Sequence, residues 1–92
     1  MDGLFTWDTE KEKINIKKHG ISFQEALTVF SDDGATIISD EAHSENEDRF
    51  IIIGFSRIPR LLVVCHCYRE NNITHIISAR KANKRETALY GG

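Results

Sequence analysis

The chain has 92 residues, of which 40% are hydrophobic and 28% are charged, and its formal net charge is −2. This composition is that of one globular domain over residues 1–92 and excludes intrinsic disorder. No apolar run approaches the roughly 18 residues of a membrane span, and the start at Met1 lacks the cationic and apolar regions of a signal peptide. We therefore expect a cytoplasmic protein without a membrane partner.

The first predicted elements are a short strand and a helix. Aromatic residues over Phe5–Trp7 indicate the strand. Thr9-x-x-Glu12 has the spacing of a capping box, in which two side chains satisfy free backbone amides at a helix start. The helix is expected to end at His19, where the imidazole can cap the last carbonyls, with Gly20 as a left-handed stop.

A second helix is predicted directly after the first. Ser22-x-x-Glu25 repeats the capping spacing, and apolar residues recur at helical intervals, namely Phe23, Ala26, Leu27 and Phe30. This periodicity turns one apolar stripe toward a core. The helix is expected to end at the turn-forming segment Asp32–Gly34.

Four strands and a closing helix are predicted for the remainder. The strands are β-branched or aromatic runs separated by turn-forming residues: Ala35–Ser39, Phe50–Ser56, Leu61–Tyr68 and Ile73–Ala79. Short connections allow only antiparallel neighbours, so three of them should form a meander. Asn83-x-x-Glu86 then starts the helix. This order predicts an α+β domain with helices on one face of a mostly antiparallel sheet.

The charges are divided unequally along the chain. Residues 1–48 contain four lysines and twelve acidic residues, a net −8, whereas residues 49–92 contain eight basic and two acidic residues, a net +6. Within the first half, Asp40–Asp48 forms an acidic segment that is expected to be solvated. The asymmetry indicates either contact with nucleic acid or acidic helices that pair with basic strands inside one fold.

A group of four cations follows the last predicted strand: Arg80, Lys81, Lys84 and Arg85. Positive side chains in the first turn of a helix are disfavoured by its dipole, so their presence favours a phosphate partner. Arg80 is the strongest candidate, because a strand end holds a guanidinium rigidly and a guanidinium matches phosphate with two hydrogen bonds. In the other interpretation Glu86 pairs with these cations and the region is structural.

The histidines and cysteines are compatible with several roles. His66 and His75 lie on adjacent predicted strands, where each is either a general base or a hydrogen-bonded residue of the sheet. His43 is expected to be simply exposed. Cys65 and Cys67 point to the same face about 7 Å apart, a spacing that does not suit a disulfide. The intervening His66 faces away, so no metal site is predicted, and no cofactor motif is present.

Two aromatic residues are candidates for stacking on a nucleotide base. Tyr90 follows the cationic group closely, and base stacking and a structural role are both open for it. Trp7 is expected to belong to the core.

Seven segments together resemble the BrnT family of bacterial type II toxins: Phe5–Asp8, Lys18–Ala26, His43–Ser44, Glu47–Gly54, Arg60–Val64, Ile76–Ala82 and Lys84–Glu86. The resemblance covers about residues 5–90 and implies a RelE-like fold, with two N-terminal helices packed on an antiparallel sheet and a short C-terminal helix. It also implies a metal-independent endoribonuclease that cleaves RNA and halts translation. The implied partner is a BrnA-like ribbon-helix-helix antitoxin, through which the complex binds operator DNA.

The resemblance also assigns roles to residues. It implies catalysis by Arg80, Arg85 and His19, and it leaves the general base unassigned. RNA contacts are expected from five further residues: Lys18, Arg60, Lys81, Lys84 and Tyr90. A second interpretation stays open, in which the chain is a RelE-like module without catalysis that binds an antitoxin or nucleic acid and acts in transcriptional autoregulation.

Overall fold

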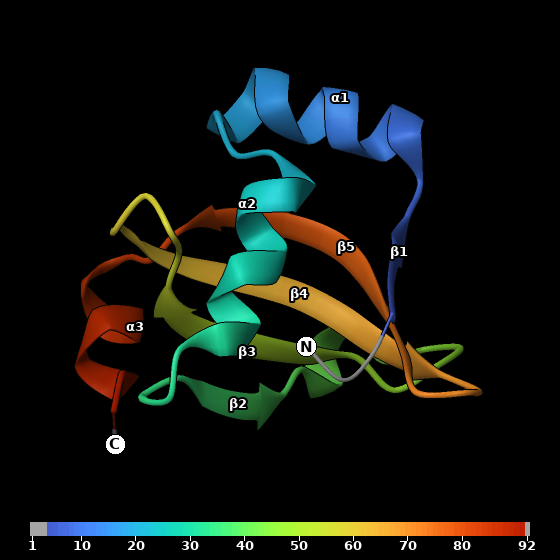
Figure 1. Ribbon diagram of the computed structural model, residues 1–92. Coiled ribbons are helices and arrows are strands. Elements are labelled where there is room, and N and C mark those ends of the chain that lie inside the picture. The colour runs from blue at the N-terminus through green and yellow to red at the C-terminus, as the bar shows by residue number, and fades with distance from the viewer. Residues whose placement is uncertain (1–3, 92) are drawn as a thin grey trace.

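A five-stranded sheet organises the computed structural model, which describes residues 4–91 (Figure 1). The strands lie in the order β1-β5-β4-β3-β2 and comprise β1 (Leu4–Trp7), β2 (Thr36–Ser39), β3 (Phe50–Phe55), β4 (Leu61–Arg69) and β5 (Ile73–Lys81). Strands β3 to β5 form the predicted three-stranded antiparallel meander, and β2 extends it through an antiparallel pairing with β3. Strand β1 adds in parallel to the edge of β5.

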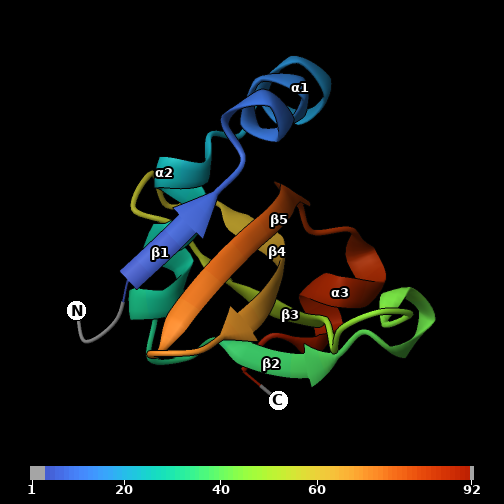
Figure 2. The ribbon, with the colours of Figure 1, turned by 90° about the vertical axis from the view of Figure 1, so that its right-hand side faces the viewer.

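The helices lie on both sides of this sheet. Helix α1 (Thr9–His19) runs along the part of the β5 edge that β1 leaves open, and α2 (Phe23–Leu27) continues as the 3₁₀ turn η1 (Thr28–Ser31) across one face (Figures 1 and 2). Helix α3 (Lys84–Leu89) lies on the opposite face and contacts β3 (Figure 2). The α+β class is confirmed, but only the N-terminal helices share one face.

The helix ends follow the predicted signals with two exceptions, the N-cap of α1 and the end of the second α-helix, which changes to a 3₁₀ turn at Thr28 before the predicted stop. Gly20 has φ 72°, and its amide donates to Ile16 O, as expected of a left-handed stop. The N-cap of α1 is Asp8, not Thr9, because the Asp8 carboxylate accepts from the amides of residues 10 and 11. Glu12 is thereby released from capping, and its carboxylate accepts from the Phe23 amide at 2.8 Å. This bond ties α1 to the start of α2.

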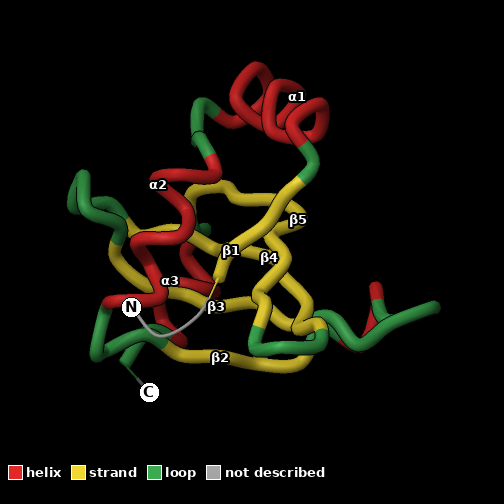
Figure 3. The backbone as a smooth tube through the Cα atoms, turned by 45° about the vertical axis from the view of Figure 1, so that its right-hand side comes forward, coloured by secondary structure: helices red, strands yellow, loops and turns green. Residues whose placement is uncertain are grey.

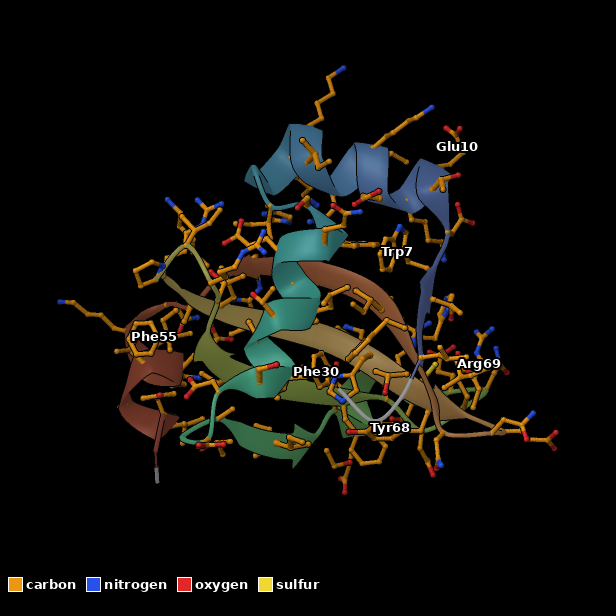
Figure 4. The ribbon with its side chains drawn as sticks, viewed as in Figure 1. Trp7, Glu10, Phe30, Phe55, Tyr68 and Arg69 are labelled. Carbon is orange, nitrogen blue, oxygen red and sulfur yellow. The ribbon has the colours of Figure 1, made fainter. Side chains whose placement is uncertain are left out.

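The core fills the space between the sheet and α2–η1. Its fully buried residues include Ile21, Phe23, Ala26, Val29, Leu62, Val64, Ile76 and Ala79. Trp7 packs edge-on against Phe23, with ring centroids 6.2 Å apart, which agrees with its predicted place in the core (Figure 4). Burial of these apolar side chains is the main stabilising contribution.

A register shift between β4 and β5 decides which side chains leave the core. Cys65 is opposite Ser78 and His66 is opposite Ile76, so Ile77 has no partner on β4. Such a bulge re-aims side chains locally. Ile76 and Ala79 are consequently both buried in the core, while Ile77 and Ser78 face away from it.

The acidic segment between β2 and β3 contains a second 3₁₀ turn, η2 (Glu41–His43), and projects beyond the sheet (Figure 3). Its neck is closed by the Asp40 amide, which donates to Arg49 O at 2.8 Å. No helix within residues 4–91 is long and apolar enough to cross a membrane.

Candidate active site

Two hollows meet at the bulge in β5. The first, here called the helix hollow, has a volume of about 210 Å³ and is lined by Lys11, Ile14, Asn15, Lys18, His19, Ile77 and Ser78. The second, here called the sheet hollow, has a volume of about 200 Å³ and is lined by Asp40, His43, Arg49, Ile51, Val63, Cys65, Ile77, Ser78 and Arg80. Because Ile77 and Ser78 line both, residues from α1 and from the face of the sheet that carries α3 converge on one strand.

The helix hollow brings together two residues that the resemblance implied. Lys11, Asn15 and Lys18 recur at intervals of three or four residues, so they occupy the side of α1 that faces β5. His19 is the last residue of the helix and is half-buried beside Lys18. His19 and Lys18 thus lie together beside Ser78 of β5, and the roles implied for them stay predictions.

Arg80 lines the sheet hollow and not the helix hollow. It is opposite Val63 on β4 and therefore points away from the α2 face. Its guanidinium donates to both carboxylate oxygens of Glu86, from Nη1 at 2.7 Å and from Nη2 at 2.6 Å. The Arg80 side chain is still 42% exposed, whereas that of Glu86 is 13% exposed. Part of the guanidinium thus stays open to the hollow.

Glu86 holds Arg80 and the start of α3 at the same time. Its carboxylate accepts from the Asn83 amide at 2.9 Å, and Asn83 Oδ1 accepts from the Glu86 amide at 2.8 Å, which confirms the predicted capping box. The hydrogen bond with Arg80 lowers the pKa of Glu86 and raises that of Arg80. The pairing that the sequence left as an alternative is present, and it fixes the guanidinium in place.

Three groups of the sheet hollow were missed by sequence reasoning. Asp40 precedes η2 and His43 is its last residue, so both belong to the acidic segment that was expected to be solvated, and Arg49 lies between that segment and β3. His43 Nδ1 lies 3.1 Å from each carboxylate oxygen of Asp40. Both His43 and Arg49 belong to the segments that carry the family resemblance, which was the available signal.

Cys65 is the potential nucleophile of the sheet hollow. Its Sγ lies 4.0 Å from Asp40 Oδ2. Burial, together with the negative charge of Asp40, raises the pKa of the Cys65 thiol. The residue therefore stays a protonated thiol at neutral pH, and a thiolate is not supplied to this site.

The other predicted RNA contacts lie outside the two hollows. Lys81 is opposite Leu62 and thus points to the α2 face, where its charge acts on Glu25. Arg60 donates to Glu25 from Nε at 2.7 Å and from Nη2 at 2.6 Å. The cations that adjoin in sequence are therefore divided between the two faces of the sheet.

The last three predicted residues, Lys84, Arg85 and Tyr90, lie on α3 or at its C-cap. Lys84 and Arg85 are exposed and make no ion pair within the described part of the chain. Tyr90 is half-buried, and its hydroxyl donates to Asp32 Oδ2 at 2.8 Å. Its ring packs edge-on against Phe55, with centroids 5.1 Å apart.

The two histidines considered as bases lie elsewhere. His66 is fully buried on the α2 face, with Nδ1 3.1 Å from Val64 O and Nε2 2.9 Å from Tyr68 Oη. Burial lowers its pKa. His75 Nδ1 is 2.9 Å from Thr6 Oγ1 at the β1–β5 pairing. Both are hydrogen-bonded residues of the sheet.

Arginines, an imidazole and a lysine-bearing helix thus surround two adjoining hollows of a small α+β domain. The family model described as "Ribonuclease toxin, BrnT, of type II toxin-antitoxin system" matches residues 7–86, and the chain belongs to this family. The protein is thus an endoribonuclease toxin, with RNA as its substrate and an antitoxin as its partner.

Comparison with solved structures agrees with the fold. The crystal structure of the Brucella abortus ribonuclease toxin BrnT superposes with a TM-score of 0.70, at 24% sequence identity, over 89% of this chain and 99% of that chain. A likeness at this identity shows the fold. Comparison with curated proteins gave no match.

Proposed function

We propose that the chain cleaves RNA without a metal ion, by attack of the RNA's own 2′-hydroxyl on the adjacent phosphate, and that this cleavage halts translation in the cytoplasm. The observation that carries the proposal is the fixed position of Arg80 in the sheet hollow. A guanidinium held by Glu86 cannot turn away, and its exposed part faces the space where a phosphate would lie. It stabilises the negative charge that builds on the phosphate oxygens during attack.

The remaining predicted residues act around this centre. His19, as a further catalytic residue, and Lys18, as an RNA contact, approach the same strand from the helix hollow on the other side of Ser78. Arg85, as a second catalytic cation, and Lys84 act from the exposed side of α3, and Lys81, Arg60 and Tyr90 extend RNA contact beyond the hollows. Positive charge at these positions attracts the RNA backbone.

The proposed partner is a BrnA-like ribbon-helix-helix antitoxin. Membership of a type II toxin-antitoxin family supports an antitoxin that is a protein. In the proposal the antitoxin neutralises the toxin, and the complex binds operator DNA through the ribbon-helix-helix region and represses its own operon.

One observation favours the second interpretation, a module that binds without cleaving. Both Arg60 and Arg80 are engaged by glutamates, and such pairing reduces the charge that is available to a phosphate. The two interpretations differ in whether the wild-type protein cleaves RNA.

Induced expression in bacteria, with growth and cleavage of purified RNA in excess EDTA as readouts, distinguishes them. We expect the wild type to arrest growth and cleave RNA despite the chelator, and the Arg80→Ala/Arg85→Ala variant to do neither while it remains folded. Arg57→Ala, which removes an exposed arginine outside both hollows, is the matched control. Absence of cleavage by the wild type would support the binding module, and cleavage abolished by EDTA would refute metal independence.

A further inference from the structure

The geometry of the sheet hollow points to His43 as the general base of the cleavage, with Asp40 as its positioning residue; this inference rests on the proposed function. The two side chains lie in the same hollow as Arg80. A carboxylate can only accept a hydrogen bond, so Nδ1–H of His43 donates to Asp40. That bond fixes the tautomer and leaves Nε2 as the proton acceptor.

The contact of Asp40 with His43 is informative, because an aspartate at an N-cap position normally uses its carboxylate to cap the helix. Asp40 is the N-cap of η2, yet its side chain makes no hydrogen bond to the free amides of that turn. Both carboxylate oxygens are instead equidistant from the His43 ring nitrogen, at 3.1 Å. The aspartate thus orients an imidazole in place of stabilising the turn.

The segment that carries the pair is anchored to the sheet. The Asp40 amide donates to Arg49 O at 2.8 Å. Ser44 Oγ donates to Asp40 O at 2.8 Å and accepts from the Arg49 amide at 2.9 Å. These three bonds close the neck of the projecting loop at the start of β3. A base must be held within reach of its proton, and this closure provides the required rigidity.

Other groups near the hollow are less suited to the role. Glu86 is engaged by Arg80 and the Asn83 amide. Cys65 remains a protonated thiol. His66 is 0% exposed and bonded at both ring nitrogens. His43, in contrast, has a side chain that is 67% exposed beside an Asp40 side chain that is 20% exposed.

The step that follows is a transesterification. Nε2 of His43 takes the proton of the 2′-hydroxyl as O2′ bonds to phosphorus. The bond between phosphorus and O5′ breaks, and the departing 5′-oxygen receives a proton from solvent water, while the imidazolium later returns its own proton to solvent. The products are a 2′,3′-cyclic phosphate and a 5′-hydroxyl, and no oxidant or reductant is needed.

The pH dependence of this step reflects the charges that surround the imidazole. They come from the loop, the start of β3, β5 and α3: Asp40, Glu45, Glu47, Arg49, Arg80 and Glu86. The titratable Cys65 on β4 also lines the hollow but is uncharged. Only a neutral imidazole can accept the proton, so cleavage should rise with pH through the range in which imidazole titrates. Removal of the Asp40 carboxylate frees the Nδ1–H bond that fixes the ring, so the rate should fall while the rising limb stays.

The test is single-turnover cleavage of a single-stranded RNA from about pH 5 to about pH 9 by wild type, His43→Gln, Asp40→Asn and Arg80→Ala. We expect His43→Gln to lose about 10²–10⁴-fold in rate, together with the rising limb. Asp40→Asn should lower the rate and keep the rising limb, because the imidazole is present but no longer oriented. His75→Gln, which changes a histidine on β5 away from both hollows, should retain the wild-type rate and profile.

The outcomes separate this inference from the proposed function. His43 is not the base if His43→Gln keeps the wild-type rate, or if it loses rate uniformly with an unchanged rising limb. In either case loss of cleavage in Arg80→Ala would leave the proposed function standing. A wild type that cleaves RNA at no pH would overturn both. Thermal unfolding of each variant checks that the exposed His43 was replaced without loss of the fold.

Discussion

Asn15 joins α1 to the open edge of β5, and its removal should destabilise the protein strongly. Its side chain is 6% exposed. Nδ2 donates to Ile21 O and to Ala79 O, each at 2.9 Å, and Oδ1 accepts from the Ala79 amide at 3.1 Å. These bonds replace the strand partner that Ala79 lacks at the edge, since β1 ends its pairing with β5 at Ile76.

The expected cost follows from the groups that Asn15→Ala leaves without partners. Two carbonyls and one amide become buried and unsatisfied, and such groups cost about 1–3 kcal/mol each when solvent cannot reach them. Alanine recovers about 0.5 kcal/mol through its higher helix propensity, and water entering the vacated space recovers more. We therefore expect a net loss of about 2–4 kcal/mol, or a fall in Tm of at least about 8 °C for a domain of this size.

Urea and thermal denaturation measure this loss, and amide hydrogen exchange locates it. The Ala79 amide should exchange much faster in Asn15→Ala, while amides in the β3–β4 pairing should follow the global stability. Gln24→Ala, at an exposed position of α2, is the control and should change stability by less than about 0.5 kcal/mol. A Tm within about 2 °C of wild type, or an Ala79 amide that stays protected, would refute the account of this edge.

Two further predictions concern stability. Hydrogen bonds from Arg60 hold the pKa of the Glu25 carboxyl below its ordinary value of 4.5. The charged carboxylate therefore stabilises the fold fully above pH 4.5, and this stabilisation is lost as the pH falls through the folded-state pKa. Glu25→Gln should therefore lower Tm by several degrees at about pH 7 and by less near pH 3; a gap that does not narrow in acid would contradict this. A Cβ at Gly54 would lie 2.9 Å from both Ala35 Cβ and Val29 Cγ1. Gly54→Ala should therefore lower the free energy of unfolding by about 1–3 kcal/mol, as measured by urea denaturation. An unchanged midpoint would show that η1 can move away from β3.

Local signals in the sequence were sufficient for most element boundaries. A serine before an apolar helix, a glycine after one and the asparagine-glutamate box at the last helix each act within four residues, and all three caps are present. Thr9 was misassigned because Asp8, which directly precedes it, also satisfies the N-cap preference. The capping spacing alone could not decide between two adjacent polar residues.

Features that depend on contacts between distant segments could not be predicted from such local signals. The role of Asn15 requires knowledge that α1 lies over an unpaired strand edge, 64 residues away along the chain at Ala79. The bulge at Ile77 is likewise set by pairing with β4, and it determines that Ser78 leaves the core. His43 was assigned to a solvated loop because nothing within its own segment shows that the loop closes at the start of β3.

The cations of β5 and α3 lie in different surroundings, although they are close together in the sequence. On β5, successive side chains point to opposite faces, so Lys81 joins the charge environment of Glu25 while Arg80 enters the sheet hollow. Glu86 Oε1 accepts from both Arg80 and the Asn83 amide, so one carboxylate holds the guanidinium and the start of α3. A phosphate that binds in the hollow therefore meets a guanidinium whose orientation is already fixed by the start of α3. In the proposed function such a site needs little reorganisation during the reaction, and the exposed Lys84 and Arg85 attract the RNA backbone before it reaches the hollow.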